Sequence, residues 1–262
     1  MGIGMSLWYN TGQHWKEVSM ARNDAHMKGI LVCSGPSLNK IDISTLTGMG
    51  KRVFALSGTY PEVKPDVCIG MDLPIFYDGR LFDEPFIKIL RGGHKDKTRE
   101  GRVINTSVNL YYADVEELED YNELFLRRNH DIQFVWHNNT LSTALHLMVW
   151  MGHREIYIAG CDLDNSKQHY FNDITLEDRC KKRNQRLHEQ LFKYLEWFVP
   201  TAAINGIQVY SISPHSRINT LMNYVDLKDL NDEIRSVQQE RDYLPHCWTY
   251  DYATDGLPVE KE

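Results

Sequence analysis

The chain has 262 residues, of which 42% are hydrophobic, and its 36 acidic and 29 basic side chains give a net charge of −7. This length and apolar content are sufficient for one domain with a substantial core. The acidic balance disfavours stable nucleic-acid binding as the main task of the protein. No apolar run approaches the ~20 residues that span a bilayer, and the N-terminus lacks a secretory pattern, so we expect a cytoplasmic protein without a membrane span.

Five cysteines are scattered along the chain, at Cys33, Cys68, Cys161, Cys180 and Cys247. None of them forms a C-x-x-C pair. An odd number of cysteines without paired spacing predicts reduced thiols rather than a disulfide scaffold or a zinc site.

Strand-like and helix-like segments alternate along most of the chain. Residues 1–27 are polar and aromatic with no clear period, and we interpret them as an arm that packs on the domain or on a second copy in a homo-oligomer. Short apolar runs predict strands at 29–33, 52–56, 66–70, 86–90, 132–136, 155–160 and 206–211. Apolar spacing predicts helices beginning near residue 38 and spanning 114–128, 141–151, 179–199 and 227–241.

This alternation predicts an α/β fold, a Rossmann-like and mostly parallel sheet with helices on both faces. We divide the chain into the arm at 1–27, a nucleotide-binding catalytic domain at 28–223 and a charged helical tail at 224–262. In such sheets the ligand lies outside the carboxyl ends of the strands.

The first strand runs directly into the turn Ser34-Gly35-Pro36-Ser37. A glycine here lets the backbone approach a ligand closely, and the free N–H groups at a helix start attract a phosphate. Ser37 either caps the helix or gives its hydroxyl to the same anion. The alternative is a well-capped turn that binds nothing, and the residues alone leave both interpretations open.

Polar residues also follow the other predicted strands. His137, Asn138 and Asn139 precede a helix, where an asparagine serves as N-cap, as a contact to a base or sugar, or as both. The candidate nucleotide-binding residues at all these strand ends are Ser34, Gly35, Pro36, Ser37, Ser57, Gly58, Asp72, Asn138, Asn139, Ser213 and Ser216.

Three segments together resemble one superfamily of transferases. They are CSGPSLNKID at 33–42, NNTLSTALHLMVWMGHREIYIAGCDL at 138–163 and GIQVYSISPHS at 206–216. The superfamily contains bacterial CMP-sialic acid sialyltransferases, motility-associated flagellin glycosyltransferases and MptE-like hydroxymethylpterin diphosphokinases, and the likeness covers roughly residues 28–223. It implies a Rossmann-like fold with a small lid-like insertion. Cys33 replaces a glycine of the relatives, and Ser34 stands where sialyltransferases carry an asparagine that helps to hold the phosphate.

The resemblance implies transfer of a sugar from a CMP-, UDP- or GDP-linked donor to a hydroxyl. The sialyltransferases place a histidine base between the Gly-x-Asp strand and the last strand, and His169 and His188 lie in that interval. A histidine accepts a proton near neutral pH, which suits this role. Tyr170 would stabilise the departing phosphate. The plainer interpretation is that both histidines are surface residues.

A diphosphokinase is the alternative enzyme that the resemblance implies. Asp72, Asp162 and Asp164 would then hold Mg²⁺ between the phosphates of ATP or GTP, although aspartates after strands also cap turns. Asp162 is the strongest single candidate, because both mechanisms place it at the site. A third hypothesis is a nucleotide-binding module without catalysis. The acceptor stays open among a glycan, a protein, a small molecule and a modified nucleic-acid base.

Overall fold

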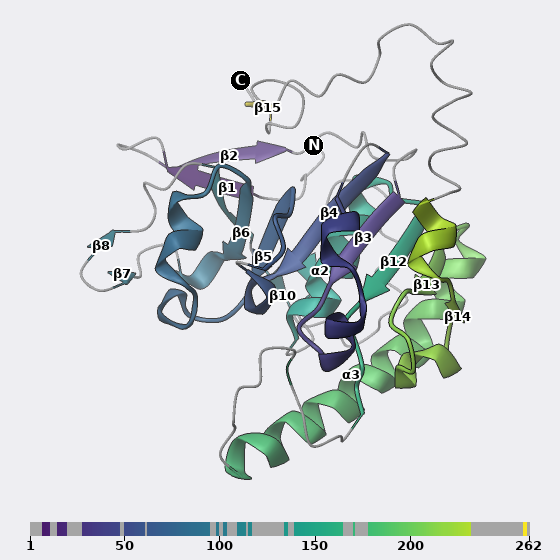
Figure 1. Ribbon diagram of the computed structural model, residues 1–262. Coiled ribbons are helices and arrows are strands. Elements are labelled where there is room, and N and C mark those ends of the chain that lie inside the picture. The colour runs from purple at the N-terminus through teal and green to yellow at the C-terminus, as the bar shows by residue number, and fades with distance from the viewer. Residues whose placement is uncertain are drawn as a thin grey trace, which may run out of the picture.

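The apolar runs of the sequence form neighbouring parallel strands in the computed structural model (Figure 1). The structure describes residues 7–10, 15–19, 28–47, 50–60, 62–94, 98–99, 102–103, 109–113, 115–116, 134–135, 139–164, 170, 178–231 and 259–260. Six of the predicted strands are β3 (Lys28–Val32), β4 (Lys51–Leu56), β5 (Val67–Gly70), β6 (Ile87–Arg91), β12 (Glu155–Ala159) and β13 (Gln208–Ser211). Their residues are almost all buried, as expected for strands covered on both faces.

The main sheet has the strand order β14-β13-β12-β3-β4-β5-β6-β9-β1-β2-β15. The added strands are β9 (Leu110–Ala113), β14 (Asn223–Tyr224), β1 (Leu7–Asn10), β2 (Trp15–Ser19) and β15 (Val259–Glu260). All pairs from β14 to β9 are parallel, whereas β1, β2 and β15 pair antiparallel. The chain moves outward from β3 through β4, β5 and β6 and then returns to β12 on the other side of β3. This topological switch point confirms the α/β, Rossmann-like fold.

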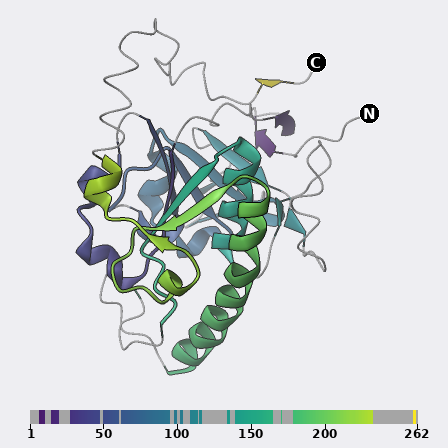
Figure 2. The same cartoon turned by 90° about the vertical axis from the view of Figure 1, so that its right-hand side faces the viewer.

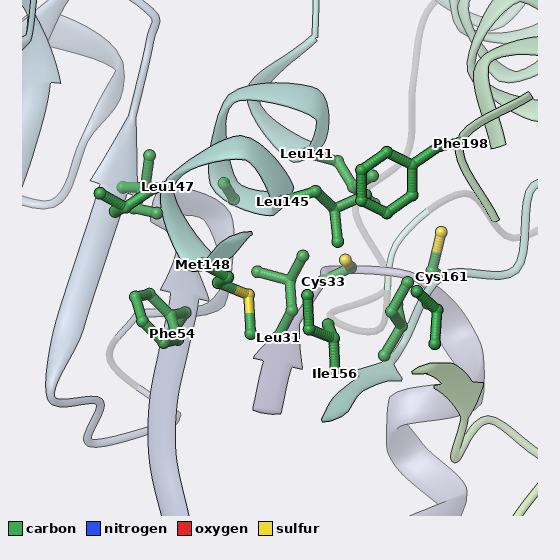
Figure 3. Packing of buried hydrophobic residues seen from close by; sticks show 14 of the residues in the cluster. Leu31, Cys33, Phe54, Leu141, Leu145, Leu147, Met148, Ile156, Cys161 and Phe198 are labelled. Carbon is green, nitrogen blue, oxygen red and sulfur yellow. The ribbon is translucent and has the colours of Figure 1, made fainter. Parts of the chain in front are cut away.

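Two long helices cover one face of the sheet. They are α2 (Thr140–Met151) and α3 (Asp178–Ile204), whose buried side chains pack on β3, β4 and β12. Figure 3 shows Leu141 and Leu145 of α2 and Phe198 of α3 meeting above Cys33 and Cys161. Asn139 caps α2 through its side chain, and Gly152 ends it at φ 101°. The cap is one of the roles that the sequence left open for Asn139, and a glycine is the residue that a left-handed helix end favours.

The opposite face is covered by shorter elements. These are the 3-10 turns η1 (Pro36–Lys40), η2 (Ile43–Thr45) and η5 (Gly79–Asp83) and a helical turn at residues 227–231. Ile30, Val32 and Leu38 belong to the apolar cluster beneath the first two turns. Further 3-10 turns are η3 (Ser57–Thr59), η4 (Pro74–Phe76), η6 (Gly92–His94) and η8 (Arg217–Thr220).

Several segments differ from the sequence prediction. The helix expected after the first strand is broken into η1 and η2, because Asp42 turns its carboxylate to the Ser44 N–H and starts a new turn. Within the predicted helix at 114–128, β10 (Val115–Glu116) is a strand that pairs with β11 (Phe134–Val135). The arm contributes the β1–β2 hairpin to the main sheet. A second small hairpin joins β7 (Thr98–Arg99) to β8 (Arg102–Val103).

Four cysteines lie in the described part of the chain, and all four are free thiols. Burial raises the pKa of Cys68 to about 12. The hydrogen bond with Cys161 and burial raise the pKa of Cys33 as well. Protonated, buried thiols act as small apolar fillers. In the same part of the chain, no helix is both long and apolar enough to cross a membrane.

Candidate functional site

The carboxyl ends of β3 and β12 are joined closely at the switch point. The Gly35 N–H donates to the Gly160 carbonyl at 2.6 Å, and the Ser37 N–H donates to Asp162 Oδ2 at 2.8 Å. A Cβ at Gly35 would lie 2.4 Å from Asp162 Oδ2, and one at Gly160, where φ is +67°, would lie 2.3 Å from the Cys33 carbonyl. Both glycines are therefore required by the close approach of the two loops.

The N–H groups of the first turn are engaged within the protein. Besides those of Gly35 and Ser37, the Leu38 N–H donates to the Gly35 carbonyl at 3.1 Å, and Pro36 has no N–H. The η1 turn has five residues, too few for a strong helix dipole. The backbone donors of Gly35, Ser37 and Leu38 are thus used within the protein, and the turn forms one wall of the candidate site.

The donors nearest to this wall are on Ser34 and the following turn, η3. A Cβ placed on Gly58 would lie 3.7 Å from Ser34 Oγ, so the two loops adjoin. Ser34 and Ser57 are half-buried and Gly58 is exposed. Three predicted binding residues are therefore brought together at the carboxyl ends of β3 and β4.

Asp162 is a buried carboxylate that ties two loops together. It is 7% exposed, and burial raises its pKa, although the hydrogen bond from the Ser37 N–H opposes this effect. The negative charge of Asp164 raises the pKa further. The Asp162 carbonyl accepts from the Arg217 N–H at 3.2 Å. Its carboxylate is thus directed into the protein, toward the turn after β3.

The two predicted serines after β13 hold the neighbouring strand. Ser213 Oγ accepts from the Gly160 N–H at 2.7 Å, and Ser216 Oγ donates to the Cys161 carbonyl at 2.6 Å. Both serines are buried. Between them His215 has a φ of 61°, and Leu163 in the adjoining loop has a φ of 51°. The serines therefore shape this side of the site, next to two residues with strained backbone.

The long helix α3 extends past the carboxyl edge of the sheet. Its 27 residues span about 40 Å, whereas the five residues of β12 span about 17 Å. In a β12–α3–β13 crossover the helix runs antiparallel to the strands, so its N-terminal half lies beyond their carboxyl ends. Figure 2 shows this half reaching beyond the sheet. We call residues 178–190 the overhang of α3.

Two of the predicted catalytic residues, Tyr170 and His188, are related through this overhang. His188 continues the stripe of the buried residues Leu191 and Leu195 by one helical turn. Asn184 is one turn further, and its Nδ2 donates to the Tyr170 hydroxyl at 3.2 Å. Tyr170 and His188 therefore reach the same side of α3. His169 lies outside the described residues, as does Asn138.

The predicted magnesium ligands are not brought to one point. Asp72 follows β5, and Asp162 follows β12, three strand spacings or about 14 Å away along the sheet. Asp72 and Asp164 are exposed, whereas Asp162 is buried. Oxygen ligands of one Mg²⁺ lie only about 2.1 Å from the ion. In the part of the chain that the structure describes, no group of three or more His, Cys, Asp and Glu residues could hold a metal ion.

The sequence interpretation missed three residues of this region, namely Asn184, Glu189 and Arg217. Asn184 could have been found, because it stands four residues before His188 in a predicted helix. Glu189 and Arg217 could not, because their side chains are bonded to each other across 28 residues of sequence.

Among known proteins, the chain resembles solved structures in its fold but matches no family model. No protein-family model matches the sequence, and neither does any curated protein. Among solved structures, the chain is similar to the sialyltransferase CstII from Campylobacter jejuni in complex with the substrate analogue CMP-3FNeuAc, with 18% identity, a TM-score of 0.46 and coverage of 76% of this chain and 86% of that one. It is also similar to CST-II in complex with a trisaccharide acceptor and CMP, with 17% identity, a TM-score of 0.47 and the same coverage. At these values the likeness does not decide the function, which has to be argued from the site.

Proposed function

We propose that the protein is a glycosyltransferase that moves a sugar from a nucleotide-activated donor to a hydroxyl acceptor. The observation that carries the proposal is the hydrogen bond between Tyr170 and Asn184, which stands one helical turn before His188 on the overhang of α3, beyond the carboxyl ends of the strands. A general base and a phenolic hydroxyl, placed beside a nucleotide site, are the groups that transfer from a nucleotide sugar requires.

His188 acts as the general base in this proposal. It takes the proton from the acceptor hydroxyl as that oxygen attacks the anomeric carbon, and the bond to the nucleotide phosphate breaks. Tyr170 donates its hydroxyl proton to the departing phosphate. Asn184 supports this direction, because its amide donates to the Tyr170 oxygen, so this contact does not use the tyrosine proton.

The donor phosphate lies against Ser34 and Gly58, the partly accessible residues of the two adjoining loops. The turn 35–37 and Asp162 form the wall behind it, since the Ser37 N–H is bonded to Asp162 and the Gly35 N–H to the Gly160 carbonyl. Because one Mg²⁺ cannot bridge Asp72 and Asp162 across the sheet, we propose that the transfer needs no metal held by these aspartates. CMP-linked sugars are the first donors to test, since the CstII structures named above hold CMP or a CMP-sugar analogue.

The test is donor consumption by the purified protein. CMP-, UDP- and GDP-sugars and ATP are offered with a panel of glycans and small hydroxyl compounds, once in EDTA and once in Mg²⁺. We expect consumption of a nucleotide sugar that depends on an acceptor and persists in EDTA. Consumption of ATP only, abolished by EDTA, would contradict the proposal, as would no turnover of any donor.

The role of His188 is tested in the same assay by His188→Gln. General acid–base catalysis contributes about 10²- to 10⁴-fold, so kcat falls by that factor while the donor still binds. Gln190→Ala is the matched control, because Gln190 is exposed on the same helix and off the stripe. Equal effects of the two substitutions would exclude His188 as the base.

A further inference from the structure

Arg217 lies where α3 comes close to the loop after β12. Its Nη1 and Nη2 donate to Glu189 Oε1 at 2.6 Å and Oε2 at 3.0 Å, so the guanidinium and the carboxylate form a two-point pair. Its guanidinium carbon also lies 3.9 Å from the centre of the Phe192 ring. One side chain thus contacts two successive turns of α3.

The same residue holds the loop that carries Asp162. The Arg217 N–H donates to the Asp162 carbonyl at 3.2 Å, and Nη1 donates to the Leu163 carbonyl at 3.3 Å. Leu163 is one of the residues with left-handed backbone, at a φ of 51°. Arg217 therefore joins the loop at the switch point to the helix that carries the candidate base.

The Arg217–Glu189 contact lies where the buried part of α3 ends. From residue 180 to residue 190, none of the α3 residues is buried, whereas Leu191, Tyr194 and Leu195 are. Glu189 stands next to His188, at the end of the overhang that adjoins the buried part of α3. The Arg217–Glu189 pair is half-exposed, with side-chain exposures of 32% and 47%, and such pairs add little to the free energy of unfolding.

We propose that Arg217 is a positioning residue, which with Glu189 clamps the overhang of α3 to the Asp162 loop and so fixes His188 relative to the bound donor. The catalytic meaning of the clamp rests on the function proposed above, whereas its mechanical meaning does not. A helix that projects beyond its core contacts bends easily, and a shift of about 1 Å at a catalytic group can cost about a hundredfold in rate.

The mechanical part is tested by hydrogen exchange of the full chain without any ligand. Arg217→Gln, Glu189→Gln and the double variant are compared with the wild type. We expect amides of residues 180–190 to exchange about tenfold faster in all three variants, with no additional change in the double variant, while the melting temperature stays close to that of the wild type. Unchanged exchange in this segment would overturn the clamp.

Glu155→Gln is the matched control. Glu155 pairs with Lys28 at the amino end of β12, and its side chain is 39% exposed, close to the exposure of Glu189. Each substitution therefore removes the negative charge of one ion pair, and the two pairs lie at opposite edges of the sheet. Faster exchange of residues 180–190 in Glu155→Gln as well would show a general loosening rather than a clamp.

The catalytic part is tested with the donor that the wild type consumes. Arg217→Gln lowers kcat about tenfold to a hundredfold and leaves KM for the donor within about twofold, because the donor site itself is intact. Arg217→Lys keeps the charge but not the two-point geometry, and recovers part of the rate. A raised KM with an unchanged kcat would overturn the positioning role. Lack of turnover in the wild type would refute the proposed function, whereas the exchange experiment would still decide the clamp.

Discussion

The two sides of the candidate site are built in opposite ways. At the switch point, Gly35 and Ser213 are hydrogen-bonded to Gly160, Ser37 is hydrogen-bonded to Asp162, and these residues are largely buried. On the overhang of α3, none of residues 180–190 is buried, and a few polar contacts replace the core. The turn after β3, which carries the strongest sequence signal, is therefore the tightly bonded and rigid wall of the candidate site. The groups that we propose for chemistry lie on or beside the overhang of α3, which has no buried residue from 180 to 190.

We expect the largest loss of stability from a substitution at the switch point, where the backbones of the two loops approach most closely. Gly160→Ala forces a Cβ to within 2.3 Å of the Cys33 carbonyl at a residue whose φ is +67°. We expect a loss of about 3 kcal/mol or more in the free energy of unfolding, measured by urea denaturation.

Gly206→Ala, measured in the same way, separates the cost of backbone strain from the cost of atomic overlap. Gly206 has a φ of +74°, but a Cβ there meets nothing within 4 Å. Only the backbone strain remains, and the expected cost is about 1 kcal/mol. Equal costs at Gly160 and Gly206 would contradict the close joining of β3 and β12.

Substitution of Asp162 is expected to change the free energy of unfolding by less, and it tests whether the side chain serves mainly to bond the two loops. Asp162→Ala leaves the buried Ser37 N–H without its acceptor and is expected to cost about 1–3 kcal/mol in the free energy of unfolding. Asp162→Asn keeps an oxygen for this hydrogen bond and should cost less. A larger cost for asparagine than for alanine would rule out the hydrogen bond as the main role of the side chain.

The pH dependence of the asparagine variant follows from the raised pKa of Asp162. The native state keeps this proton to higher pH than the unfolded chain, so the contribution of Asp162 to stability falls as pH rises from about 3.9, the ordinary aspartate value, through the raised pKa. Asparagine has no proton to lose. Asp162→Asn should therefore gain stability relative to the wild type across this range in urea denaturation, and a relative loss would contradict the burial of the charge.

The sequence predicted six strands of the central sheet because each is a short apolar run, and the cap that it offered as one role of Asn139 is present at the start of α2. It did not reveal β9, whose Leu110–Ala113 carries two tyrosines that fit a strand or a loop. Nor could it show that α3 continues past Pro200, since packing of Ala202 in the core outweighs the lost N–H.

The contacts around the candidate site could not be predicted from the sequence. The polar residues that follow the strands lie at the carboxyl edge of the sheet, as their positions in the sequence require. However, the bond between Ser37 and Asp162 joins residues 125 positions apart, and local pattern contains no information about it. The same holds for Asn184 and Tyr170, whose contact depends on where α3 begins relative to the sheet.

The most direct test of the central claim is hydrogen exchange of the full chain with and without the nucleotide of the donor that it consumes. We predict slower exchange in three segments, residues 33–38 and 57–60 at the switch point and residues 179–190 on the overhang, because the ligand lies between these two sides of the site. Protection confined to the N-terminal strands at residues 7–19, or absent from the overhang, would contradict the account.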